Sequence, residues 1–115
     1  MKVKLWKKPN GEAPIEEFMS SLSEKIRNKL LNRFVQLAQY ELKNIYQSGI
    51  IKKLKDYDLY QLSLRYQGVF VRILLTINNS TCYLLHAFKK KNNETPKKEI
   101  KLAVNRKKLL HRSKK

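Results

Sequence analysis

A single histidine close to a run of lysines is the first residue of this sequence with evident chemistry. His86 lies two residues before Phe88, and Lys89, Lys90 and Lys91 follow. Neighbouring cations lower the pKa of an imidazole and keep it neutral, so that it can accept a proton. The alternative is a half-buried histidine that is hydrogen-bonded to backbone. The sequence leaves both interpretations open.

An arginine interrupts the apolar segment 69–75, which is predicted to be a strand. A guanidinium in that position needs an anion, which is either a carboxylate of the chain or a bound phosphate. The placement of Arg72 relative to His86 depends on the turn between the two strands. A two-residue loop pairs Arg72 with Leu85, whereas a three-residue loop pairs it with His86.

These residue types suit the cleavage of RNA. The 2′-hydroxyl of RNA is itself the nucleophile, so a protein needs only a base, a cation on the phosphate and an acid for the leaving oxygen. We expect His86 to be the base or the acid and Arg72 to clamp the phosphate, and Lys90 or Lys89 to support the leaving group. Metal-dependent cleavage needs converging carboxylates. The nine acids fall mainly in expected helices and loops, so no metal and no cofactor are expected.

Further cations could contact RNA outside the reacting bond. Lys52 and Lys53 precede an expected strand that ends near Arg65. Contact with phosphates needs only such cations at suitable spacing. Phe88 could stack on a base, and Lys91 adds charge beside it. The alternative is that the lysines are solvated surface and that Phe88, like the strand tyrosines, belongs to the core.

Composition agrees with a polyanionic partner. The chain has 26 Lys and Arg against 9 Asp and Glu, a net charge of +17, which is usually retained where a polyanion neutralises it. Residues 1–115 suffice for one domain. No apolar run approaches the ~20 residues of a membrane span, and no secretory signal is evident, so we expect a cytoplasmic protein without membrane contact. The single cysteine, Cys82, is expected in the core.

The hydrophobic pattern predicts the elements that must position these residues. Alternation over 1–6 indicates a strand, and helices are expected from Pro14 and from the Ser21-Leu22-Ser23-Glu24 segment, the second one ending at Gly49. Strands are predicted at 60–66, 69–77 and 81–88, and a final helix from Thr95-Pro96 to about Leu110. The fold class is therefore α+β: an antiparallel sheet of three to five strands, packed against two N-terminal helices, plus a C-terminal helix.

An ordered series of short motifs adds a family resemblance. The motifs are Leu59-Tyr60-Gln61-Leu62, Arg65-Tyr66, Val71-Arg72-Ile73, Leu84-Leu85-His86-Ala87-Phe88-Lys89-Lys90 and Thr95-Pro96-Lys97-Lys98-Glu99-Ile100. With them the sequence resembles the phage-derived, HigB-like branch of the RelE toxin superfamily, from Pro14 to the terminal helix. It departs from that pattern at Gln61, where the branch often has an acid, and at Ala87, where it often has glycine. The first departure argues against a carboxylate base at position 61.

The resemblance implies a microbial-RNase-type fold and a type II toxin–antitoxin system. It implies metal-independent cleavage of mRNA on the translating ribosome. It also implies neutralisation by a HigA-like antitoxin with a helix-turn-helix domain, in a heterotetrameric complex. The functional surface carried over from the family contains Lys52, Lys53, Arg65, Arg72, His86 and Lys89 to Lys91.

Two other functions remain to be compared with this one. A non-catalytic RNA-binding or ribosome-binding protein needs only the charge, and it would protect RNA instead of cutting it. A DNA-reading regulator fits worse, because the expected terminal helix carries apolar residues to bury and no helix-turn-helix pair stands free of the sheet.

Overall fold

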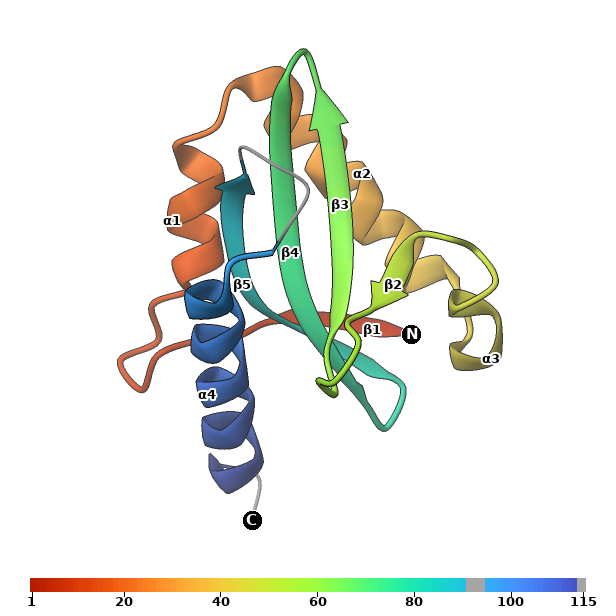
Figure 1. Ribbon diagram of the computed structural model, residues 1–115, viewed down its shortest axis with the longest axis vertical. Coiled ribbons are helices and arrows are strands. Elements are labelled where there is room, and N and C mark those ends of the chain that lie inside the picture. The colour runs from red at the N-terminus through yellow and green to blue at the C-terminus, as the bar shows by residue number, and fades with distance from the viewer. Residues whose placement is uncertain (91–94, 114–115) are drawn as a thin grey trace.

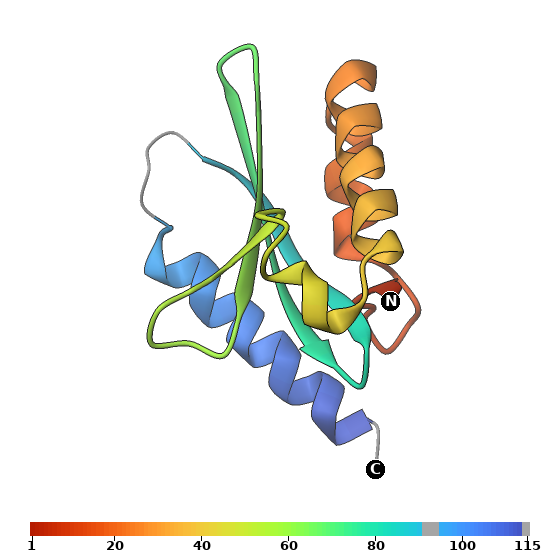
Figure 2. The ribbon, with the colours of Figure 1, turned by 90° about the vertical axis from the view of Figure 1, so that its right-hand side faces the viewer.

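A five-stranded mixed sheet lies between two layers of helices in the computed structural model, which describes residues 1–90 and 95–113 (Figure 1). Figure 2 shows α1 and α2 on one face of the sheet and α4 on the other. The strand order is β1-β5-β4-β3-β2. The elements are β1 (Lys2–Leu5), α1 (Pro14–Ser20), α2 (Glu24–Gln39), α3 (Leu42–Ile45), β2 (Ile51–Lys53), β3 (Tyr60–Tyr66), β4 (Val69–Asn78), β5 (Thr81–Lys90) and α4 (Lys97–Ser113).

Two tight turns connect the three central strands. Gln67 and Gly68 have φ of 49° and 78°, and Asn79 and Ser80 have φ of 51° and 60°. Two consecutive residues with positive φ are typical of the two-residue turns that match the twist of a β-hairpin. The expected strands 60–66, 69–77 and 81–88 are therefore confirmed, and the last two extend to Asn78 and Lys90.

The expectation of an antiparallel sheet is wrong for β1, which pairs with β5 in parallel. The Lys2 amide donates to the Ser80 carbonyl (3.1 Å) and the Trp6 amide to the Leu84 carbonyl (2.8 Å). Alternation of Val3 and Leu5 with lysines predicts one buried face of a strand. It carries no information on which strand is the neighbour or on its direction, because those depend on contacts with residues about 80 positions away.

The second helix is shorter than expected. It ends at Gln39 because Tyr40 and Glu41 have extended backbone, with ψ of 145° and 155°, and the separate α3 follows. At its other end the helix begins within the expected segment, but its N-cap is Ser23 and not Ser21: the Ser23 hydroxyl accepts a hydrogen bond from the Ile26 amide (3.3 Å), and Glu24 is the first helical residue. The helix period does not reveal such a break, because Ile45 is buried in α3 as it would be in a continuous helix.

The sheet separates two hydrophobic clusters. On one face α2 buries Ile26, Leu30 and Leu37 against strand residues that include Leu62, Ile73 and Leu84. On the other face α4 buries Ile100 and Ala103 against Leu59, Leu74, Tyr83, Leu85 and Phe88. Burial of this apolar surface fixes α4 across the sheet. Side chains of both clusters therefore alternate along the same strands.

Cys82 lies in the α2-side cluster, fully buried, as expected from the sequence. Burial raises the pKa of its thiol to about 11, and the thiolate is the reactive form. We expect iodoacetamide to leave Cys82 unmodified in the native protein at pH 7.5 and to alkylate it fully in urea, as measured by mass spectrometry. Equal rates in both conditions would contradict the burial.

Candidate nucleic-acid interface

The pairing register aligns most of the candidate residues in three rows on the face of the sheet that α4 covers in part. Each row contains one residue from each of β3, β4 and β5, and Lys52 on β2 extends the third row through its pairing with Gln61. The first row lies next to the turn between β3 and β4. The rows are Arg65–Phe70–Lys90, Ser63–Arg72–Phe88 and Gln61–Leu74–His86.

A β-bulge in β5 decides which side chains join these rows. Leu75 pairs with Leu84, but Leu74 pairs with His86, so Leu85 is an extra residue in β5. A slip of one residue moves every following side chain to the other face of a sheet. Without the bulge, His86 would therefore face α2. With it, His86, Phe88 and Lys90 lie on the same face as Arg72.

Neither of the two expected pairings of Arg72 is correct. The turn is the two-residue Asn79-Ser80, and with the bulge it places Arg72 opposite Phe88. His86 is a diagonal neighbour of Arg72 on the same face, at a separation that long side chains can bridge. The sequence could not decide this, because a bulge is not visible in the alternation of apolar and polar residues.

The two arginines of the rows have neutral surroundings. The guanidinium of Arg65 lies 5.0 Å from the centre of the Phe70 ring, and Arg72 donates a hydrogen bond to the Ser63 hydroxyl. No ion pair among the residues that the structure describes involves either arginine. Lys90, in the same row as Arg65, is only 6% exposed. Cations on three adjacent strands thus face the same side, and the arginine charges are available to a bound anion.

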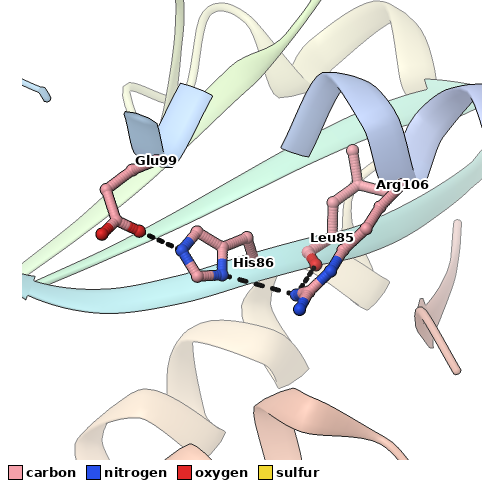
Figure 3. Close-up of polar contacts among 4 residues, drawn as sticks. All are labelled: Leu85, His86, Glu99 and Arg106. Atoms are coloured by element: carbon pink, nitrogen blue, oxygen red, sulfur yellow. Dashed lines mark hydrogen bonds and ion pairs between the residues drawn. The ribbon is translucent and has the colours of Figure 1, made fainter. Parts of the chain in front are cut away.

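His86 is held between β5 and α4 by contacts at both ring nitrogens (Figure 3). Its Nε2 contacts the Glu99 carboxylate, and its Nδ1 lies 3.4 Å from Nη1 of Arg106. The same Nη1 donates to the Leu85 carbonyl at 2.8 Å. Because a guanidinium can only donate, Nδ1 accepts and Nε2 carries the proton that is donated to Glu99. The imidazole in this arrangement is neutral.

Burial is the main cause that lowers the pKa of His86, and the nearby Arg106 charge adds to it, against the opposing effect of Glu99. The side chain of His86 is 13% exposed. The direction expected for the pKa of His86 is therefore confirmed. Its causes, however, are the burial of the ring under α4 and the charge of Arg106 on that helix, whereas the sequence suggested the neighbouring lysines. Neutral His86 stabilises the fold above about pH 6.5, the value for an unfolded histidine.

As the pH falls through 6.5, the unfolded chain binds a proton that native His86 resists, so the free energy of unfolding should decrease. We expect the decrease between pH 7.5 and pH 5.5 to be smaller in His86→Gln, which does not titrate. Urea unfolding at several pH values measures it. Identical profiles for wild type and His86→Gln would contradict the assignment.

Two predicted cations lie on the opposite face of the sheet. Lys53 pairs with Tyr60, and Lys89 pairs with Val71, whose side chain belongs to the α2-side cluster. Both lysines are exposed. They do not join the three rows, because neighbouring residues in a strand point to opposite faces. Lys91 lies outside the described residues.

Phe88 shares a row with Arg72 but is only 7% exposed. Its ring stacks on His86, with 5.5 Å between the ring centres and 22° between the planes. The Phe88 ring is thus packed on His86 inside the protein, whereas the sequence predicted that it stacks on a base. Phe70, half-buried beneath Arg65, is the aromatic residue of the rows with more exposure.

The residues of the three rows lie within a region of the chain that matches a known protein family. Residues 17–108 match the family described as Phage derived protein Gp49-like (DUF891). The chain belongs to the Gp49-like family. That family is related to the RelE toxins of toxin–antitoxin systems. A search of curated proteins gave no match.

The match to the Gp49-like family includes all three rows, and it also includes two residues that sequence reasoning missed, Glu99 and Arg106. Both lie on α4 at one helical stripe with Ala103, at i, i+4 and i+7, which was a usable signal. Ser63 and Gln61 were also given no role. Gln61 is buried, and its carbonyl oxygen accepts a hydrogen bond from the Thr95 hydroxyl (2.6 Å), which ties the start of α4 to β3.

Residues 1–90 and 95–113 contain no group of three or more histidine, cysteine and acidic side chains arranged to hold a metal ion. None of the helices in those ranges is both long and apolar enough to cross a membrane.

Proposed function

We propose that this Gp49-like protein is a HigB-like toxin of a type II toxin–antitoxin system. It acts in the cytoplasm as a metal-independent endoribonuclease that cleaves mRNA on the translating ribosome. The observation that carries the proposal is the set of cations on three adjacent strands, in which Arg65 and Arg72 have no carboxylate partner among the described residues. The relation of the family to RelE toxins supports it.

The proposed reaction uses the RNA's own nucleophile. The 2′-oxygen attacks the adjacent phosphorus and loses its proton to a base, and the bond to the 5′-oxygen breaks as that oxygen gains a proton. The products have a 2′,3′-cyclic phosphate and a 5′-hydroxyl. Arg72 stabilises the negative charge on the phosphate oxygens, while Arg65 and Lys52 hold flanking phosphates. Lys90 supports the leaving oxygen.

His86 can serve as the base only after one change in its surroundings. Glu99 accepts the Nε2 proton, so the lone pair of Nδ1 is the one that could take a proton from the 2′-hydroxyl. Arg106 occupies that position. A phosphate of bound RNA attracts a guanidinium more strongly than a neutral ring nitrogen does, and its arrival would withdraw Arg106 from His86. Glu99 would then fix the ring as carboxylates do in other catalytic dyads.

Primer extension on a translated message tests the proposal. Purified protein should cut the message only during translation, and the fragments should carry 5′-hydroxyl ends, as measured by their resistance to ligation before phosphorylation. Fragments with 5′-phosphates would indicate a different chemistry. An uncut message would reject the nuclease and leave the fold unaffected.

One observation favours a second candidate, a non-catalytic protein that binds RNA or the ribosome. Both ring nitrogens of His86 are engaged inside the protein, which leaves no lone pair for a base in this arrangement. The same rows of cations would then serve affinity alone. This candidate predicts a footprint of protected RNA at the position where the nuclease predicts a cut.

A nuclease of this kind requires neutralisation in the cell that makes it. We propose a HigA-like helix-turn-helix antitoxin as the partner, in a heterotetrameric complex. The resemblance to HigB-like toxins implies that such an antitoxin is encoded beside the toxin. Co-expression of that neighbouring helix-turn-helix protein should relieve the growth arrest that the chain causes alone. Arrest that persists during co-expression would argue against that partner.

A further inference from the structure

An apolar groove of about 680 Å³ runs along α2 on the side away from its main contact with the sheet. It lies between α1, α2 and β1, and its apolar lining includes Val3, Leu5, Met19, Leu31, Phe34 and Val35. Leu31 is 44% exposed and Val35 is 55% exposed, and the two lie one helical turn apart. Two large apolar side chains are therefore presented to solvent side by side.

Packing on the sheet does not explain this second apolar stripe. The side of α2 that faces the sheet is formed by Ile26, Leu30 and Leu37, which are all buried. A helix that only covers a sheet needs one such stripe, and its other side is normally polar. Leu31 and Val35 extend the apolar surface beyond that need. Contiguous exposed apolar surface of this kind marks sites of interaction.

A second hollow, of about 810 Å³, lies on the other side of β1, which is an edge strand of the sheet. Leu5 lines both hollows, so the apolar surface continues around this edge. The second hollow also contains Trp6 and Leu109, and its charged lining consists of two exposed lysines, Lys4 and Lys7, and one acid, Glu16. No ion pair among the described residues involves these lysines. We name Leu5, Leu31, Phe34, Val35, Lys4 and Lys7 the β1-edge surface.

Charge determines what can cover this surface. A second copy would bring another +17, and lysines on an edge strand disfavour pairing of identical chains. The phosphates of RNA do not suit an apolar groove, and Arg65 and Arg72, which do suit them, lie at the end of β3 and β4 away from the residues of β5 that pair with β1. A segment with apolar side chains flanked by carboxylates matches both the groove and the lysines.

We propose that the β1-edge surface is the docking site for an acidic amphipathic segment of a protein partner. Apolar side chains of that segment occupy the groove beside Leu31 and Val35, and its carboxylates meet Lys4 and Lys7. For the identity of the partner the inference rests on the proposed function, which supplies a helix-turn-helix antitoxin. Docking at this edge leaves Arg65 and Arg72 uncovered, so attachment of the partner and cleavage of RNA depend on different residues.

The test measures the affinity of the purified helix-turn-helix protein, encoded beside this chain, for variants of the full chain by calorimetry. We expect L31E/V35E to weaken binding at least 100-fold and K4E/K7E to weaken it about tenfold with a reduced dependence on salt. All four positions are exposed, and circular dichroism checks the fold. L102E is the matched control, because Leu102 is 38% exposed on α4 and lines neither hollow. It should bind like wild type.

Cleavage of a translated message by the free variants is measured in parallel and should be unchanged. Wild-type affinity of L31E/V35E overturns the inference, and so does loss of binding in R65A/R72A alone, which would place the partner on the three rows. A wild-type dimer in sedimentation that L31E/V35E dissociates would identify a second copy as the occupant and reject the proposal. If the wild-type chain neither binds the neighbouring protein nor cleaves RNA, both proposals fail; cleavage without binding rejects this one only.

Discussion

Replacement of Arg72 by alanine is expected to reduce the rate of mRNA cleavage by about 100-fold. Arg72 lies in the middle row, on the central strand of the three that carry cations. Removing a preorganised donor to the developing charge of a phosphate costs on the order of 10²–10³ in rate. The loss of the hydrogen bond to the Ser63 hydroxyl should cost little stability, because Ser63 is exposed.

Single-turnover cleavage and urea unfolding of the same preparations measure this effect. Lys53→Ala is the matched control, since Lys53 is an exposed cation on the opposite face, and its rate should remain within about threefold of wild type. Arg72→Lys should fall between the two, because lysine keeps the charge but loses the planar fork of donors. A Lys53→Ala effect as large as that of Arg72→Ala would show that total charge, and not the three rows, drives cleavage.

The largest expected effect on stability is that of Leu74→Ala. Leu74 is fully buried at the centre of the α4-side cluster, and it pairs with Gln61 and His86 in the third row. We expect a loss of about 2–5 kcal/mol in the free energy of unfolding, from lost transfer energy and the cavity left behind. For a domain of this size the midpoint of thermal unfolding should fall by roughly 10–20 °C.

Urea unfolding and calorimetry measure the loss. Leu102→Ala removes the same atoms from an exposed position on α4 and should change the free energy of unfolding by no more than about 0.5 kcal/mol. If Leu74→Ala were as mild as Leu102→Ala, α4 would not be seated on the sheet as the structure shows. The contacts of Glu99 and Arg106 with His86 would then have no rigid support.

Local signals in the sequence were sufficient for most of the elements. Period-two alternation located β3, apolar runs separated by turn residues located β4 and β5, and the Thr95-Pro96 pair preceded α4. The segment that contains the start of α2, whose residues Ile26, Leu30 and Leu37 are buried, was located from the capping sequence before it. These features depend on neighbours a few positions apart, so one sequence contains them. The predicted cleavage of RNA rests on residue types and net charge, which are also properties of the sequence itself, and it stays a prediction.

Features that depend on distant residues were decided only by the tertiary structure. The bulge at Leu85 brought His86 to the face of Arg72 and excluded Lys89, because it shifts the alternation of β5 by one residue. The contacts of Glu99 and Arg106 with His86 arise from the packing of α4 across β5. The sequence alone determined the strong positive charge and placed one histidine next to a run of lysines, a combination from which contact with a polyanion is predicted. Tertiary packing determined which cations share a face, and it brought Glu99 and Arg106 into contact with the two ring nitrogens of His86. The reason is that strand register and helix docking are set by the burial of side chains that lie far apart in the chain.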